Sequence, residues 1–257
     1  MEPNLHPWPF DPSVLYLQDT HKSQLLWDEV IDSSTLFRSR RVEHAWNILG
    51  AWPPHPRVLD IRYRGSIYHC VVDGQVQHDR ALVTTMIEGW RPEAHTFHLC
   101  TGEATITLQD VEVMYGLQVD GCLLYIEEPQ PQPPLSYREE LTRLTDYVPR
   151  EGEMWGQIRM SMVALYTHLH LLDIERLITD DKPQVDVNRS DRLYLLIKFG
   201  GILFPNTSGS YVSLKYLVFL KDLGELGCYI WGATVLAYLY RSLCKASTGD
   251  KRDVSGF

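Results

Sequence analysis

The chain has 257 residues, of which 44% are hydrophobic and 22% charged, and its formal net charge is -9. A chain of this length can bury a sizeable core as one large or two small domains, and its composition excludes a disordered protein. The acidic charge argues against a protein that coats DNA or an anionic membrane with its whole surface, because such domains are basic.

The first 78 residues carry few strong structural signals. Residues 1–20 contain four prolines near the start, which fix φ and lack an N–H donor, so we predict an extended arm. Residues 42–49 are compatible with a short helix. Residues 67–72 are rich in β-formers and precede the turn dipeptide Asp73-Gly74, which predicts a strand.

The next segment carries the densest set of signals in the chain. Asp79 is a predicted N-cap for an amphipathic helix that ends near Gly89. Apolar and polar residues then alternate from Phe97 to Leu108 around a Thr101-Gly102 turn. This pattern predicts a β-hairpin with one apolar face.

A second helix is predicted directly after the hairpin. Thr107 and Asp110 have the spacing of a capping box, with Asp in place of the usual Glu, and Gly116 supplies a helix end. Farther on, the run EEPQPQPP is the clearest linker, because repeated prolines favour a polar, semi-extended segment. The predicted organisation is an arm at 1–20, an N-terminal part at 21–126, a linker at 127–137 and a helical part at 138–257.

The C-terminal half is predicted to contain four helices. The first carries an apolar stripe from Ile158 in alternating four- and three-residue steps. Asp191 is predicted to open the second helix, Gly200-Gly201 to end it, and Ser213 to cap the third. The fourth, at 227–243, is apolar almost all round and is expected in the middle of a bundle. The predicted fold is therefore mainly α with a small β-hairpin subdomain (α+β) and a helical bundle in the C-terminal half.

The five cysteines are scattered and show no C-x-x-C spacing. Prolines stand at the start of the chain where a signal peptide would be apolar, so we expect reduced thiols in a cytosolic or nuclear protein. The longest uncharged apolar run, at 226–240, is shorter than the roughly 20 residues that span a bilayer. We therefore expect no membrane association.

Two clusters near the hairpin suggest chemistry, and each has a simpler interpretation. A zinc site is one hypothesis, but strand alternation places His98 and Cys100 on one face and His95 on the other. Hairpin histidines and buried free cysteines are the simpler alternative. An acid–base pair is the second hypothesis, although capping and turn roles explain Glu103 and Asp110 at least as well. No phosphate-binding loop or nucleophile elbow is present, so no catalytic, cofactor, metal or small-molecule site is assigned.

A basic region precedes the hairpin and is the one indication of nucleic-acid binding. Tyr63 and Tyr68 lie within or beside it and are able to stack on bases. The simpler interpretation is a solvated basic face in an acidic protein. The candidate nucleic-acid contacts are Arg38, Arg40, Arg41, Arg57, Arg62 and Arg64.

A series of long motifs runs through GWRPE and HTFHL (residues 89–99), then GE and TITLQDV (102–111), then GL and VDG (116–121). These motifs resemble the signature of the plant mobile domain, the family of the plant MAINTENANCE OF MERISTEMS proteins and their transposon-borne relatives. DPSVLYLQ with HKS (11–23), FP (204–205), and the pattern from Tyr229 to Cys244 also match, so the resemblance covers most of the chain.

The resemblance implies a nuclear role in meristem maintenance, genome stability and silencing of transposable elements, with a phosphatase-7-like partner. A transposon-derived fragment is also implied, as is a truncation, because members usually continue beyond Phe257. Related proteins carry an aminotransferase-like label, but no lysine here has the context of a Schiff-base residue, so we expect no enzyme. The same residues are alternatively the structural core of the hairpin, most clearly Trp90, Arg91, Pro92 and Phe97. The candidate interaction residues are Trp90, Arg91, Pro92, His95, Phe97, His98, Glu103 and Asp110.

Overall fold

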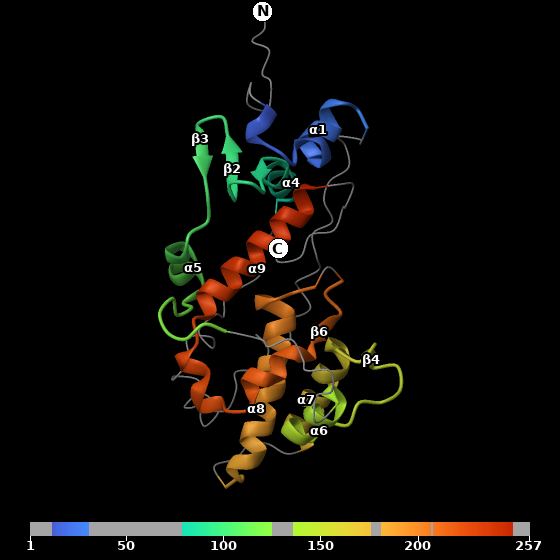
Figure 1. Cartoon of the computed structure of the whole chain (residues 1–257). Coiled ribbons are helices and arrows are strands. Elements are labelled where there is room, and N and C mark those ends of the chain that lie inside the picture. Colours follow the sequence, from blue (N-terminus) through green and yellow to red (C-terminus); the bar gives the residue numbers. More distant parts are fainter. Residues whose placement is uncertain (1–11, 31–78, 125–135, 176–180, 207, 249–257) are drawn as a thin grey trace, which may run out of the picture.

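The computed structural model describes residues 12–30, 79–124, 136–175, 181–206 and 208–248. Figure 1 shows an upper region with α1, α4 and a small sheet, and a lower region with α6, α7, α8 and a second sheet. Helix α9 (Trp231–Ser247) runs diagonally between the two regions. This confirms the predicted α+β class. The predicted helix at 42–49, the strand at 67–72, the basic region and most of the linker lie outside the described residues.

The described part of the N-terminal segment, residues 12–30, contains the short helices η1 (Pro12–Val14), η2 (Gln18–Thr20) and α1 (Lys22–Trp27). The next described helix is α4 (Arg80–Glu88). Asp79 caps α4 as predicted, because its Oδ1 accepts the N–H groups of Ala81 at 2.9 Å and Leu82 at 3.2 Å.

The first sheet contains the predicted hairpin and one further strand. Strands β1 (Trp90–Arg91), β2 (Thr96–Leu99) and β3 (Gly102–Ala104) are antiparallel in that order. The predicted extension of the second hairpin strand to Leu108 is wrong: the strand ends at Ala104 and Leu108 begins a helix. The apolar face is also smaller than expected, since Phe97 is buried but Leu99 is exposed.

The helix after the hairpin, α5 (Leu108–Tyr115), has the predicted capping box at its start. Thr107 Oγ1 accepts the Asp110 N–H at 3.2 Å, and Asp110 Oδ2 accepts the Thr107 N–H at 2.8 Å. Gly116 ends the helix in the left-handed conformation at φ 64°. The reciprocal cap outweighs the alternating pattern that predicted a longer strand, because Thr107 serves as N-cap rather than strand residue.

The second sheet was not predicted. It contains β4 (Met154–Trp155), β5 (Arg159–Ser161) and β6 (Tyr211–Ser213), all antiparallel. Ile158 lies in the β4–β5 turn, and helix α7 begins at Met162 (Met162–Glu175), so the predicted start of that helix at Ile158 is wrong. All three strands of the sheet are only two or three residues long, which leaves little pattern to detect.

Helix α6 (Tyr137–Thr145) precedes this sheet, and α8 (Gln184–Lys198) is the central helix of the lower region. The prediction that Asp191 opens α8 is wrong, because Asp191 is fully buried in the interior of that helix. Gly200-Gly201 does not end the helical path either. The chain continues through the π-helical turn η4 (Phe199–Leu203), and a Cβ on Gly200 would lie 2.6 Å from both Met162 Sδ and Val212 Cβ. Close packing therefore explains Gly200.

The remaining helices are η5 (Leu214–Leu220), η6 (Leu223–Cys228) and α9. Ser213 caps η5 as predicted, although that element is a 3-10 helix. The expectation that the last helix occupies the middle of a bundle is wrong, since α9 packs on α5, α4 and β1. Gly232 does permit close approach: a Cβ there would lie 3.0 Å from Val119 Cγ1.

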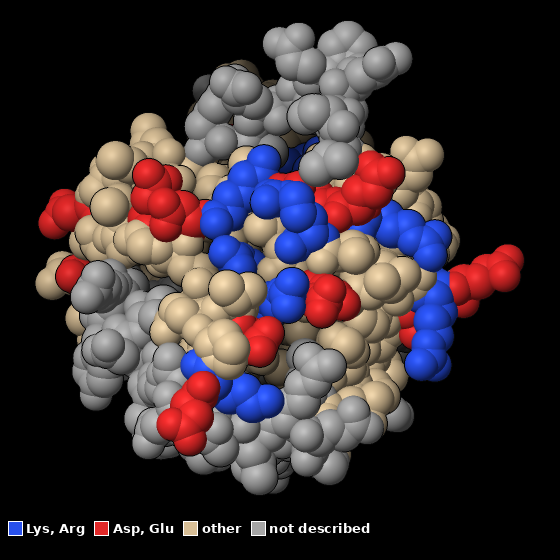
Figure 2. Space-filling view, turned by 90° about the horizontal axis from the view of Figure 1, so that it is seen from below, with Lys and Arg blue, Asp and Glu red and all other residues tan. Residues whose placement is uncertain are grey.

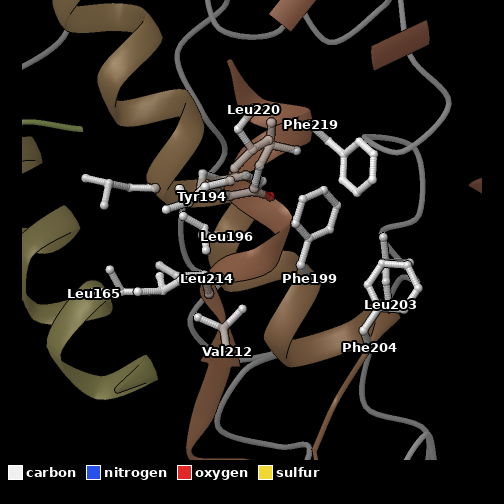
Figure 3. Close-up of a cluster of buried hydrophobic side chains, with 14 of the residues drawn as sticks. Leu165, Tyr194, Leu196, Phe199, Leu203, Phe204, Val212, Leu214, Phe219 and Leu220 are labelled. Carbon is white, nitrogen blue, oxygen red and sulfur yellow. The ribbon is translucent and has the colours of Figure 1, made fainter. Parts of the chain in front are cut away.

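Among the described residues, two clusters of buried side chains form the core. The larger one, seen in Figure 3, includes Phe199, Phe204 and Leu214 and lies around α8 and η5. The smaller one joins α4, the first sheet and the end of α9 through Ile87, Trp90, Phe97, Leu243 and Ala246. Within the described ranges, no helix is long and apolar enough to span a bilayer.

Candidate interaction site

The apolar signature residues lie inside the smaller core. Trp90 is fully buried, and its ring centroid is 4.8 Å from that of Phe97 and 5.3 Å from that of Tyr240. Its indole N–H points to Cys244 Sγ at 3.4 Å, and Pro92 is also buried. This arrangement agrees with the interpretation of these residues as the core of the hairpin region, joined to α9.

Arg91 is a buried charge of the site, with only 4% of its surface exposed. Its Nη1 reaches Gln18 Oε1 at 3.3 Å, His21 Nδ1 at 3.2 Å and Ser23 Oγ at 3.2 Å. Burial lowers the pKa of Arg91, while Glu93 and Glu103 oppose that shift. Because a guanidinium stays charged in proteins, these contacts tie the N-terminal segment to β1.

His21 completes the connection between the two segments. Its Nε2 lies 2.6 Å from the Trp90 carbonyl oxygen, which only accepts, so Nε2 carries the proton. Its Nδ1 accepts the Ser23 N–H at 3.2 Å and thereby caps α1. Burial lowers the pKa of His21 to about 4, and the neighbouring charge of Arg91 acts in the same direction. The imidazole is therefore neutral at physiological pH.

Two carboxylates border this connection. Glu93 Oε1 accepts the Leu17 N–H at 2.9 Å, which holds the N-terminal segment at a second point. Burial raises the pKa of Glu88, and the charge of the buried Lys22 lowers it. We name the set Gln18, His21, Ser23, Arg91 and Glu93 the His21–Arg91 network.

The outward face of the hairpin is polar and exposed. His98 pairs with Glu103 across β2 and β3, and Glu103 Oε2 accepts the Thr96 hydroxyl at 3.1 Å. His95 lies in the preceding turn with φ 54°, and its ring stacks on Tyr240 at 5.2 Å. The structure thus brings His98 and Glu103 together. His95 points elsewhere because it lies in a turn, and not because of strand alternation, since both His95 and Cys100 lie outside β2.

The carboxylates near the hairpin have structural contacts. Asp110 belongs to the capping box, and hydrogen bonds from Thr107 lower its pKa. The expectation of buried free cysteines is wrong for Cys100 and Cys122, which are exposed. No group of three or more potential ligands in the described part of the chain is placed to hold a metal ion.

Sequence reasoning did not identify Gln18, His21 and Ser23 as partners of Arg91. The available signal was the resemblance of residues 11–23 to the segment ahead of the family's domain. Nothing in the local pattern showed that this segment folds back over β1, because the two lie about 70 positions apart in sequence.

The lower end of the molecule carries charges of both signs. Figure 2 shows basic and acidic side chains interspersed on this face. The ion pairs of the lower region include Arg143–Glu140 at 2.7 Å and Arg189–Asp186 at 3.3 Å. The visible face therefore presents no uniformly basic surface of the kind that tracks a nucleic-acid backbone.

The sequence of the chain is similar to a known protein family and to several named plant proteins. The family model described as "Plant mobile domain" matches residues 66–257. From Arabidopsis thaliana, Serine/threonine-protein phosphatase 7 long form homolog is 31% identical over 252 residues, which cover 98% of this chain and 17% of that protein. Protein MAIN-LIKE 1 is 30% identical, with 96% of this chain and 46% of the relative covered. Protein MAINTENANCE OF MERISTEMS is also 30% identical, with 95% and 48% covered.

The chain spans less than half the length of each of these relatives. No solved structure matches it. The family model covers most of the chain and includes the hairpin, Arg91 and α9. The chain belongs to the plant mobile domain family.

Proposed function

We propose that this chain is a non-enzymatic interaction module that acts in the plant nucleus by binding a phosphatase-like protein. One observation carries the proposal: the apolar signature residues and Arg91 form a buried scaffold rather than a reactive cleft. Trp90 and Phe97 fill the smaller core, and Arg91 binds the N-terminal segment. A scaffold of this kind presents surfaces to partners instead of activating a substrate.

The relatives support the partner and the biological setting. One is named as a homolog of the phosphatase 7 long form, and the matched region makes up 17% of that protein. A region shared with a phosphatase-named protein favours a phosphatase-like partner. Another relative is named for the maintenance of meristems, which supports a role in meristem development. The roles in genome stability and transposon silencing are part of the proposal and rest on the family resemblance.

The contacts of the carboxylates support a non-enzymatic role. Asp110 caps α5, Glu93 accepts the Leu17 N–H and Glu103 accepts the Thr96 hydroxyl. A general acid or base has to face a substrate with its proton-accepting atoms. Here one oxygen of each of these carboxylates accepts a hydrogen bond from a backbone or side-chain group of the protein itself.

Affinity purification from plant nuclear extract tests this proposal. The full chain serves as bait, with and without nuclease treatment, and an unrelated acidic domain of similar size serves as the control bait. A nuclease-resistant phosphatase-like protein that then forms a saturable complex with the purified chain is the expected result. A well-folded chain that gives no such complex refutes the partner, and a fluorescent fusion that stays outside the nucleus refutes the setting.

Nucleic-acid binding is the alternative that the same experiment addresses. If the recovered proteins disappear after nuclease treatment, the basic region at Arg38–Arg64 becomes the primary site. Binding would then weaken with salt and on replacing Arg40 and Arg41 by Ala. Binding that these replacements leave unchanged excludes this region.

A further inference from the structure

The second sheet has an aromatic outer face. Trp155 is 60% exposed, and its ring centroid lies 6.2 Å from that of Tyr211. The guanidinium carbon of Arg159 lies 4.6 Å from the centroid of the Trp155 ring. Trp155 is opposite Arg159 in the register, and Tyr211 is opposite Ser161, so all these side chains share one face.

The fold does not need this face to complete its core. Met160 and Val212 point to the opposite side of the sheet, where they are essentially fully buried. Trp and Tyr combine a large apolar area with a polar tip, and this makes them frequent at binding surfaces. A Trp that is more than half exposed beside a second aromatic ring is thus a candidate contact surface.

Arg159 gives this surface a charge preference. It is exposed, and none of the ion pairs found in the described ranges involves it. Its guanidinium can stack on Trp155 and still donate in its own plane to a carboxylate. The face therefore complements an apolar ligand that carries negative charge.

We propose that the Trp155–Arg159–Tyr211 face binds an extended, proline-rich peptide segment with acidic residues. Prolines in the polyproline II conformation present rigid apolar faces to aromatic side chains and lose little conformational entropy on binding. A carboxylate of the same segment pairs with Arg159. This inference is independent of the phosphatase-like partner.

Single-stranded nucleic acid is the other ligand that stacks on exposed aromatic rings. Such binding requires a groove with several cations along the backbone. In this face Arg159 lies over the Trp155 ring, and one guanidinium can pair with a carboxylate but cannot follow a run of phosphates. A single cation beside the aromatic rings therefore favours the acidic peptide.

A peptide of sequence EEPQPQPP is the probe, because this acidic, proline-rich run occurs in the chain itself at residues 127–134. Calorimetric titration into the full chain is expected to give saturable binding. Trp155→Ala should weaken it about tenfold or more, as for a central aromatic contact. Trp27→Ala removes another exposed Trp, 52% exposed on α1, and is the matched control that should bind like the wild type.

Two further comparisons separate the components of the surface. Arg159→Gln should weaken binding and remove most of its salt dependence, without disturbing a buried group. The peptide QQPQPQPP lacks the carboxylates. Its affinity for the wild type, and the salt dependence of that affinity, should match those of the acidic peptide for Arg159→Gln. The peptide EEAQAQAA should bind at least several-fold more weakly, because it lacks the proline faces.

Three results would overturn the proposal. The first is that the EEPQPQPP peptide binds neither the wild type nor a variant in which the prolines at 129, 131, 133 and 134 are replaced by Ala. This variant removes the chain's own copy of the peptide, which could otherwise compete with the added one. The second is equal binding by Trp155→Ala and Trp27→Ala, with circular dichroism confirming that both are folded. The third is displacement of the peptide by oligothymidylate that binds more tightly through Trp155, which would assign the face to nucleic acid.

Discussion

Protonation of His21 should destabilise the protein as the pH falls below neutrality. The imidazole is 1% exposed, donates from Nε2 to the Trp90 carbonyl and lies 3.2 Å from the guanidinium of Arg91. Burial is the main reason that its pKa is about 4 in the folded state, against 6.5 as the ordinary value. At a pH between these two pKa values, His21 is therefore protonated in the unfolded chain and neutral in the folded chain.

The sign and the size of the effect follow from this difference. The folded pKa is depressed, so the contribution of neutral His21 is fully present above about pH 6.5 and is lost as the pH falls toward 4. Between about pH 7 and pH 5, proton linkage predicts a loss of about 2 kcal/mol in the free energy of unfolding. The charges that face His21 are Arg91, Lys22 and Glu93.

Urea denaturation of the wild type and of His21→Gln over this pH range is the test. Glutamine keeps an N–H donor and an oxygen acceptor but does not titrate, so its curve should lack the loss of about 2 kcal/mol. His98→Gln removes an exposed histidine from β2 and should follow the wild type. Parallel curves for wild type and His21→Gln would refute the assignment, as would an NMR titration of His21 with a midpoint near 6.5.

Three further substitutions probe local features of the fold, each by denaturant unfolding. Thr107→Ala removes the capping box of α5 and should cost about 1 kcal/mol, whereas Thr101→Ala in the exposed turn should be near neutral. Gly200→Ala should cost about 1–3 kcal/mol or more, because the new Cβ meets Val212 Cβ at 2.6 Å; a neutral result would show that this contact relaxes. Trp231→Ala should cost about 3–5 kcal/mol, since the ring is fully buried, and a loss below 1 kcal/mol would contradict its place in the larger core.

The features that the sequence determined are local ones. Asp79, Thr107 and Gly116 act on neighbouring backbone groups, so their roles follow from spacing alone. The hairpin around Gly102 is equally local. The mainly helical class and the family resemblance were also accessible, because both rest on patterns that continue along most of the chain.

Predictions failed where distant segments compete for the same residue. Ile158 fits a helical stripe, but β5 pairs with the distant strand β6, where Arg159 lies opposite Ser213, and this places Ile158 in the turn between β4 and β5. Asp191 is a residue type that often caps helices, but α8 already begins at Gln184. Asp191 therefore lies within the helix, where it is buried in the core. Gly200 is a residue type that often ends helices, but here glycine is required because a Cβ at this position would clash with Met162 and Val212.

The charged contacts of the candidate site depend on tertiary structure in the same way. Arg91 was predicted as a signature residue from its sequence context, but its partners Gln18, His21 and Ser23 became visible only when the N-terminal segment lay against β1. Likewise, no local pattern shows that Trp155 and Tyr211 share an exposed face. Sequence alone determined how short segments fold, because those interactions span a few residues. Only the tertiary structure decided which charges are buried together and which aromatic rings face solvent, because both depend on segments far apart in the chain.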